Sequence, residues 1–138
     1  MDKYPLSDEQ FETQKSRIKA FIEKWITPLG LKWWREISFE YVNLCHKDDD
    51  EEFGRPFTCT VFWPNLIATI YCYMPMIAQR SDDDLEGDLV HELCHILVAE
   101  IADYNGKDHH FHVERIVTQL AMAFRLVGET RRAEVEKI

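Results

Sequence analysis

Apolar residues near the start of the chain follow a helical spacing. They recur every three or four positions, as on one face of an α-helix, and comprise Phe11, Ile18, Phe21, Ile22, Trp25, Ile26 and Leu29. The segment from Ser7 to Gln10 can cap the start of such a helix, and Pro28 to Gly30 end it. We therefore predict a first helix between Ser7 and Pro28 whose apolar stripe faces the core.

A repeat of two replaces this spacing after Trp34. Ile37, Phe39 and Tyr41 alternate with polar residues and predict a strand. Two further strands are predicted over residues 56–63 and 66–74, where Thr, Ile, Tyr and Phe are frequent. Pro64 and Asn65 lie between them, so these two strands are predicted to form a hairpin.

Two helices are predicted to follow the strands. From Leu89 to Ala102 the chain is apolar nearly all round, so this helix should be buried on most faces. Ser81 with Asp84 three residues later resembles a capping box at its start. A second helix is predicted over residues 113–127, and its apolar stripe is Val113, Ile116, Val117, Leu120, Phe124 and Val127.

This order of elements predicts an α+β fold. It consists of an N-terminal helix, a three-stranded and mainly antiparallel sheet, and two C-terminal helices. With 138 residues the chain is expected to form a single domain, residues 1–138.

The buried helix contains the motif His-Glu-Leu-Cys-His at residues 91–95. Positions i and i+4 of a helix lie on the same face, so His91 and His95 can direct two imidazole nitrogens at one point. Imidazoles and a carboxylate buried without partners cost a few kcal/mol each, and a zinc ion supplies the partner. Glu92, turned about 100° from His91, can take a proton from water at that ion, as in HExxH peptidases.

A catalytic zinc ion needs a third protein ligand. The metzincin continuation is excluded because Val98 and Ile101 stand where its Gly and His would be. Glu114, nineteen positions after His95, begins the second helix at the margin of its apolar stripe and is the favoured ligand.

Other ligands stay open at this point. His109 and His110 are rivals to Glu114, and Glu100 and Asp103 are weaker ones. The segment from Gly106 to His109 resembles one in SprT-like proteases, but Asn105 stands where the ligating His of those proteins is expected.

The two helical motifs resemble those of small, single-domain gluzincin-type metallopeptidases of phages and mobile elements, and more distantly the ImmA/IrrE-type peptidases. The matching segments are residues 85–98, which include HExxH, and residues 113–124, which include Glu114. This resemblance implies a zincin-like domain with Zn²⁺ held by His91, His95 and Glu114, and Glu92 as the catalytic residue. It also implies a strand that holds extended substrate, for which residues 68–73 are the candidate; an ordinary strand without that role is an equal alternative.

Composition limits the setting in which such a site would act. The formal net charge of −9 argues against a nucleic-acid partner, which requires a basic surface. No apolar stretch approaches the roughly 20 residues that span a bilayer, and the N-terminus has no apolar signal region, so a cytoplasmic protein is expected. Cysteines 45, 59, 72 and 94 lack paired spacing and are expected to be small core residues.

The predicted activity is therefore hydrolysis of peptide bonds in a polypeptide substrate, with Glu92 as general base. Four residues are candidates for stabilising the oxyanion, namely Tyr104, His109, His110 and Arg125, and Asp88 and Glu100 could orient the histidines. The alternative is a catalytically silent, zinc-stabilised protein-interaction module. The substrate and the oligomeric state cannot be read from these residues.

Overall fold

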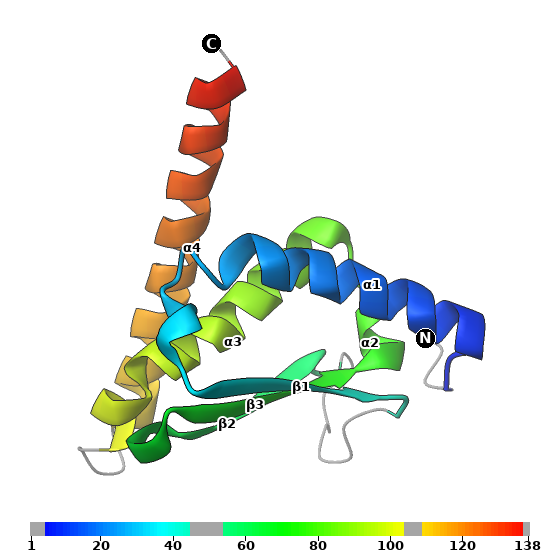
Figure 1. The fold of residues 1–138 in the computed structure, drawn as a ribbon, viewed down its shortest axis with the longest axis horizontal. Helices are drawn as coiled ribbons and strands as arrows, with labels where there is room; N and C mark the ends of the chain where they lie inside the picture. The colour runs from blue at the N-terminus through cyan, green and yellow to red at the C-terminus, as the bar shows by residue number, and fades with distance from the viewer. Residues whose placement is uncertain (1–4, 45–53, 104–108, 137–138) are drawn as a thin grey trace.

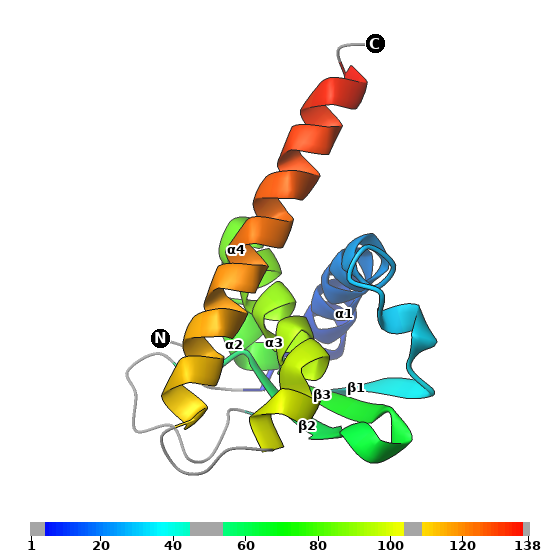
Figure 2. The same ribbon diagram turned by 90° about the vertical axis from the view of Figure 1, so that its left-hand side faces the viewer.

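The structure, a computed structural model, describes residues 5–44, 54–103 and 109–136; for 100–103, 109–112 and some later positions of the last helix it describes the backbone only. Helices α1 (Asp8–Trp25) and α3 (Asp82–Asp103) lie over one face of a three-stranded sheet. Helix α4 (His109–Glu136) runs beside α3 and then extends away from the sheet (Figures 1 and 2). The fold is therefore mixed α+β, as predicted.

The sheet has the order β1-β3-β2, with β1 at Glu36–Val42, β2 at Phe57–Phe62 and β3 at Ile67–Tyr73. Strand β2 pairs with β3 antiparallel, and β1 pairs with β3 parallel. The sheet is therefore mixed, and the prediction of a mainly antiparallel sheet was wrong for one of its two pairings. Alternation identifies a strand but not its neighbour, and β1 joins β3 rather than β2, the next strand in the chain.

The central position of β3 favours one of the two alternatives left open for residues 68–73, an ordinary strand without a substrate role. Residues 68–73 belong to this strand, and both of its edges are paired within the sheet. A strand with both edges occupied has no backbone groups left to bind an extended peptide. Among the strands described, β1 and β2 are the edges.

The turns and caps follow from local sequence. The predicted hairpin is confirmed: β2 and β3 are joined by the 3-10 turn η2 (Trp63–Asn65), after which Leu66 has a left-handed φ of 55°. Ser7 and Gln10 form a reciprocal capping box on α1, while Ser81 Oγ accepts the backbone N–H of Asp84 at the start of α3. A 3-10 turn η1 (Leu31–Trp33) and the four-residue helix α2 (Met74–Ile77) were not predicted.

One hydrophobic core joins these elements. Helix α3 contributes completely buried side chains to this core, and so does strand β3, through its alternate residues Ala68, Ile70 and Cys72. Cys94 is buried as well, Cys59 is half-buried, and Cys45 lies outside the described residues. In the described part of the chain, no helix is long and apolar enough to cross a membrane.

A single arginine ties α1 to the turn that precedes α3. Arg17 donates from Nη1 to the carbonyl of Ile77 at 3.1 Å and from Nη2 to the carbonyl of Arg80 at 2.5 Å, while its Nε binds Asp82 at 2.5 Å. These bonds fix the point at which the chain enters α3. They therefore set the position of the helix that carries HExxH.

We expect Arg17→Met to lower the free energy of unfolding by about 1–3 kcal/mol, because two carbonyls and a carboxylate lose a charged donor. Urea unfolding measures this change. Lys19→Met, at an exposed position of the same helix, is the matched control and should change stability little. Equal stability of the two variants would contradict the role given to Arg17.

Candidate metal centre

Helix α3 is buried around most of its circumference at the HExxH motif. Leu89, Val90, Leu93 and Cys94 have no exposed surface. His91 and His95, one turn apart, occupy the remaining face, where their side chains are 28% and 23% exposed. The apolar faces thus hold the helix in place, while the two imidazoles are partly exposed at the protein surface.

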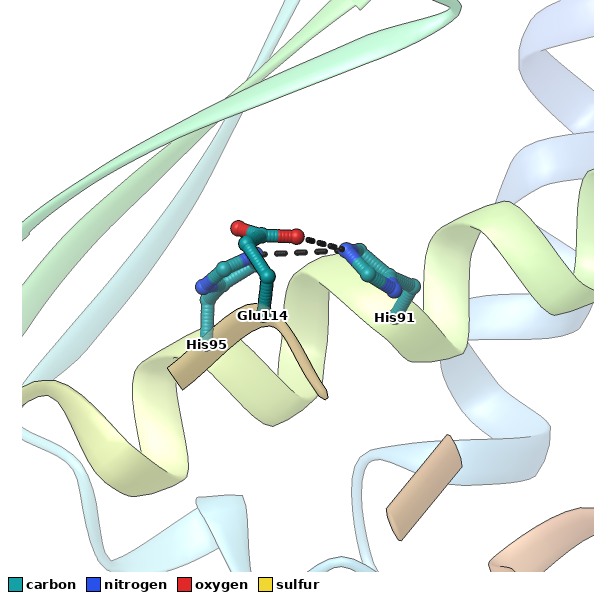
Figure 3. A group of neighbouring side chains, drawn as sticks. All are labelled: His91, His95 and Glu114. Carbon is teal, nitrogen blue, oxygen red and sulfur yellow. Dashed lines mark hydrogen bonds and ion pairs between the residues drawn. The ribbon is translucent and has the colours of Figure 1, made fainter. Parts of the chain in front are cut away.

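Glu114 reaches this face from α4. Its neighbours Val113 and Val117 are buried against the core, which fixes the first turns of α4 along α3. The Glu114 carboxylate lies 3.3 Å from His91 Nε2 and 2.9 Å from His95 Nε2. Figure 3 shows the three side chains converging from the two helices. The structure therefore brings together the three residues expected to be ligands.

The spacing of the three ligand atoms suits a small metal ion. The two Nε2 atoms are 3.3 Å apart, and one atom from each residue lies within 4.8 Å of the others. Ligands about 2.1 Å from a tetrahedral ion stand about 3.4 Å apart. One proton on an imidazole can satisfy only one of the three contacts, whereas a central cation satisfies all of them. The group can hold a metal ion.

Several rival candidates fall outside what the structure describes. This applies to the side chains of Glu100, Asp103, His109 and His110, and to the whole of Tyr104. Arg125 is described, and its Nη2 binds Asp83 at 2.5 Å and lies 3.7 Å from Glu86. Because its guanidinium is held at the N-terminal end of α3, Arg125 is not placed to stabilise an oxyanion at the metal centre.

Glu92 projects from α3 toward strand β2. Burial and, to a smaller extent, the negative charges of Glu114 and Asp88 raise the pKa of its carboxyl to about 7, against the lowering effect of the positive charge of Arg55. On β2, burial and the charge of Glu92 raise the pKa of the Cys59 thiol to about 12. Glu92 thus interacts electrostatically both with Glu114 of the candidate metal centre and with Cys59 of the edge strand β2. A divalent cation beside it would favour the ionised form.

Asp88 lies one helical turn before His91. Its Oδ2 is 3.6 Å from Arg80 Nε and is buried without a hydrogen bond. Burial raises the pKa of the Asp88 carboxyl, and the positive charges of Arg80 and His91 oppose this shift. Asp88 thus interacts electrostatically with His91, and its predicted role in orienting the histidines stays a prediction. The other candidate for that role, Glu100, has its side chain outside the described residues.

Sequence reasoning missed Arg55. It lies two residues before β2, and only the fold brings its charge near Glu92. The only signal in the sequence was a basic residue directly before a predicted strand. Such a residue does not show that its charge lies near Glu92.

Comparison of the chain with family models, with curated proteins and with solved structures finds no match. The interpretation of the metal centre therefore rests on its own residues and geometry.

We expect a divalent metal ion such as Zn²⁺ to bind the protein and to stabilise it, by roughly 2.7 kcal/mol when the free ion is at 100 times its Kd. His95→Ala and Glu114→Gln should each remove most of this stabilisation. Metal analysis together with thermal unfolding, with and without a chelator, measures both effects. Glu129→Gln, an exposed position later on α4, is the matched control; equal zinc content in all variants would contradict the centre.

Proposed function

We propose that the protein is a zinc-dependent peptidase with a gluzincin-type centre in a zincin-like domain. One observation carries the proposal: two imidazoles and a carboxylate converge at metal-ligand spacing. Glu92 follows His91 on α3, and its carboxyl is within electrostatic reach of Glu114. Two His and one Glu form a ligand set that catalytic zinc uses, and it leaves a fourth position for water or substrate. The partial exposure of all three ligands, between 23% and 38%, supports an accessible site.

When bound, zinc would polarise the scissile carbonyl and make water acidic enough to lose a proton near neutral pH. Glu92 takes the proton from the attacking water. It then delivers this proton to the leaving nitrogen as the C–N bond breaks. His91, His95 and Glu114 hold the ion on the rigid α3–α4 pair, so the reacting groups meet in a fixed geometry.

Strand β2 provides the surface for an extended substrate. Tyr73 N donates to the carbonyl of Pro56 at 2.9 Å, and residues facing each other in an antiparallel pair alternate in hydrogen bonding. It follows that Phe57, Cys59 and Val61 direct their backbone groups away from β3. No other strand among the described residues pairs with this edge. A polypeptide added there would run beside Glu92.

Glu92→Gln should retain the metal and abolish hydrolysis, because an amide cannot accept the proton of the attacking water. The experiment incubates zinc-loaded wild type with a set of unstructured polypeptides and identifies fragments by mass spectrometry. Cleavage that persists in Glu92→Gln at the wild-type rate would refute the assigned base. If zinc is bound and wild type cuts none of the polypeptides, the proposal fails in favour of a zinc-stabilised interaction module.

The substrate role of β2 predicts opposite effects of proline at adjacent positions. Val61→Pro removes an outward N–H and should preserve the fold while lowering kcat/KM at least tenfold for any polypeptide that wild type cuts. Thr60→Pro removes an N–H bonded to β3 and should instead destabilise the protein, because the sheet loses a ladder hydrogen bond. Circular dichroism and steady-state kinetics distinguish the two. Unchanged kcat/KM in folded Val61→Pro would contradict pairing at this edge.

A further inference from the structure

Strand β1 forms the edge of the sheet opposite β2, the strand that packs on α3. Glu36 N donates to the carbonyl of Leu66 at 3.2 Å, so Glu36 and every second residue after it bond to β3. Ile37, Phe39 and Tyr41 therefore direct their backbone N–H and carbonyl groups outward. No other strand in the described part of the chain pairs with this edge.

Strand β1 lacks the features that usually protect an exposed edge. Natural edge strands are often short, or they carry lysine, proline, a bulge or an inward-pointing charge. The seven residues of β1 include neither lysine nor proline, and their register with β3 is continuous. The side chains of Ile37, Phe39 and Tyr41 lie on the face that carries the core, and they are only partly buried. A strand added at this edge would therefore gain backbone hydrogen bonds and cover apolar surface.

A second copy of β1 fits this edge. If a two-fold axis passes through Phe39, perpendicular to the sheet, the two strands run antiparallel and Ile37 of each copy faces Tyr41 of the other. These are the residues whose backbone groups point outward, so each facing pair can exchange two hydrogen bonds. Their side chains are aromatic or β-branched, and such pairs across two strands stabilise a sheet.

The charges on the other face of the strand favour the same register. With the axis at Phe39, Glu40 faces Ser38 of the other copy and Glu36 faces Val42, so no two carboxylates meet. An axis at Ser38 would place Glu36 opposite Glu40, and an axis at Glu40 would place this residue opposite its own copy. Like charges directly opposite each other destabilise a pair of strands. The register with the most outward-pointing residues paired is thus also free of repulsion.

Exposed apolar side chains flank β1 at both of its ends. Trp33, shortly before the strand, is 86% exposed, and Leu44, shortly after it, is 55% exposed. In an antiparallel pair the start of one strand lies beside the end of the other. Trp33 of each copy would therefore lie near Leu44 of its partner, and association would remove both from water.

We propose that the protein forms a two-fold symmetric dimer through β1, which joins two three-stranded sheets into one of six strands. The helices of both copies lie on the same face of this sheet, and the two β2 strands form its outer edges. The inference goes beyond the proposed peptidase function and does not rest on it, because the contact uses neither a metal ligand nor the edge of β2.

The test is sedimentation equilibrium of the full chain over a range of concentrations, with no metal or substrate required. Wild type should show a monomer–dimer equilibrium. Ser38→Glu should weaken the dimer about tenfold, because each dimer gains two facing pairs of carboxylates. Ser38→Lys should tighten it, since the new ammonium group faces Glu40 of the other copy. Combining Ser38→Glu with Glu40→Lys should restore dimerisation.

Thr60→Glu is the matched control, because Ser38 and Thr60 flank the same residue, Thr69, from the two edges of the sheet. It should leave the dimer unchanged, and circular dichroism should show that every variant is folded. A wild type that is monomeric at every concentration would overturn the inference and leave this edge to a strand of another protein. Equal dissociation constants for Ser38→Glu and Thr60→Glu, or no rescue by the double variant, would also overturn it.

Discussion

The contact between α3 and α4 at His91, His95 and Glu114 is the interaction on which the site depends. Two imidazole nitrogens stand 3.3 Å apart beside a carboxylate, and a single imidazole proton can satisfy only one of the contacts among them. The apolar packing of Val113 and Val117 brings these polar atoms together. A bound cation would offset the free-energy cost of holding them close to one another. A metal ion bound by these three residues would link α3 to α4 and so stabilise the docking of α4.

A group of ion pairs also holds α4 in place farther along its length. Arg125 binds Asp83 and approaches Glu86, whose buried carboxylate also accepts from Lys24 of α1 at 2.6 Å. Eleven residues separate Glu114 from Arg125, or about 16 Å along a helix. With two supports this far apart, α4 has little freedom to swing, so Glu114 reaches the histidines from a fixed direction. The ion pairs thus contribute to the geometry of a centre that they do not touch.

Local sequence contained enough information to predict much of this arrangement. The caps at Ser7 and Ser81 and the i, i+4 histidines depend on spacing alone, and helix geometry turns that spacing directly into position. Glu114 was identifiable because it lies at the edge of the apolar stripe of a helix long enough to pack on α3. The order of the sheet and the position of Arg55 depend on contacts between distant segments, and no local pattern encodes these. Helix α2 is four residues long and contains Pro75, so it offered no periodicity to detect.

The sheet order also bears on how the chain assembles during synthesis. The central strand β3 is the last of the three to be made, so β1 and β2 have no partner until it emerges. The parallel β1–β3 pairing in addition closes a loop of more than twenty residues, which makes it a slow step. Helix α3, which carries HExxH, is synthesised after β3, when this pairing can already form. The three strands are therefore synthesised before the residues of the candidate metal centre, and the core is complete only when α3 packs on the sheet.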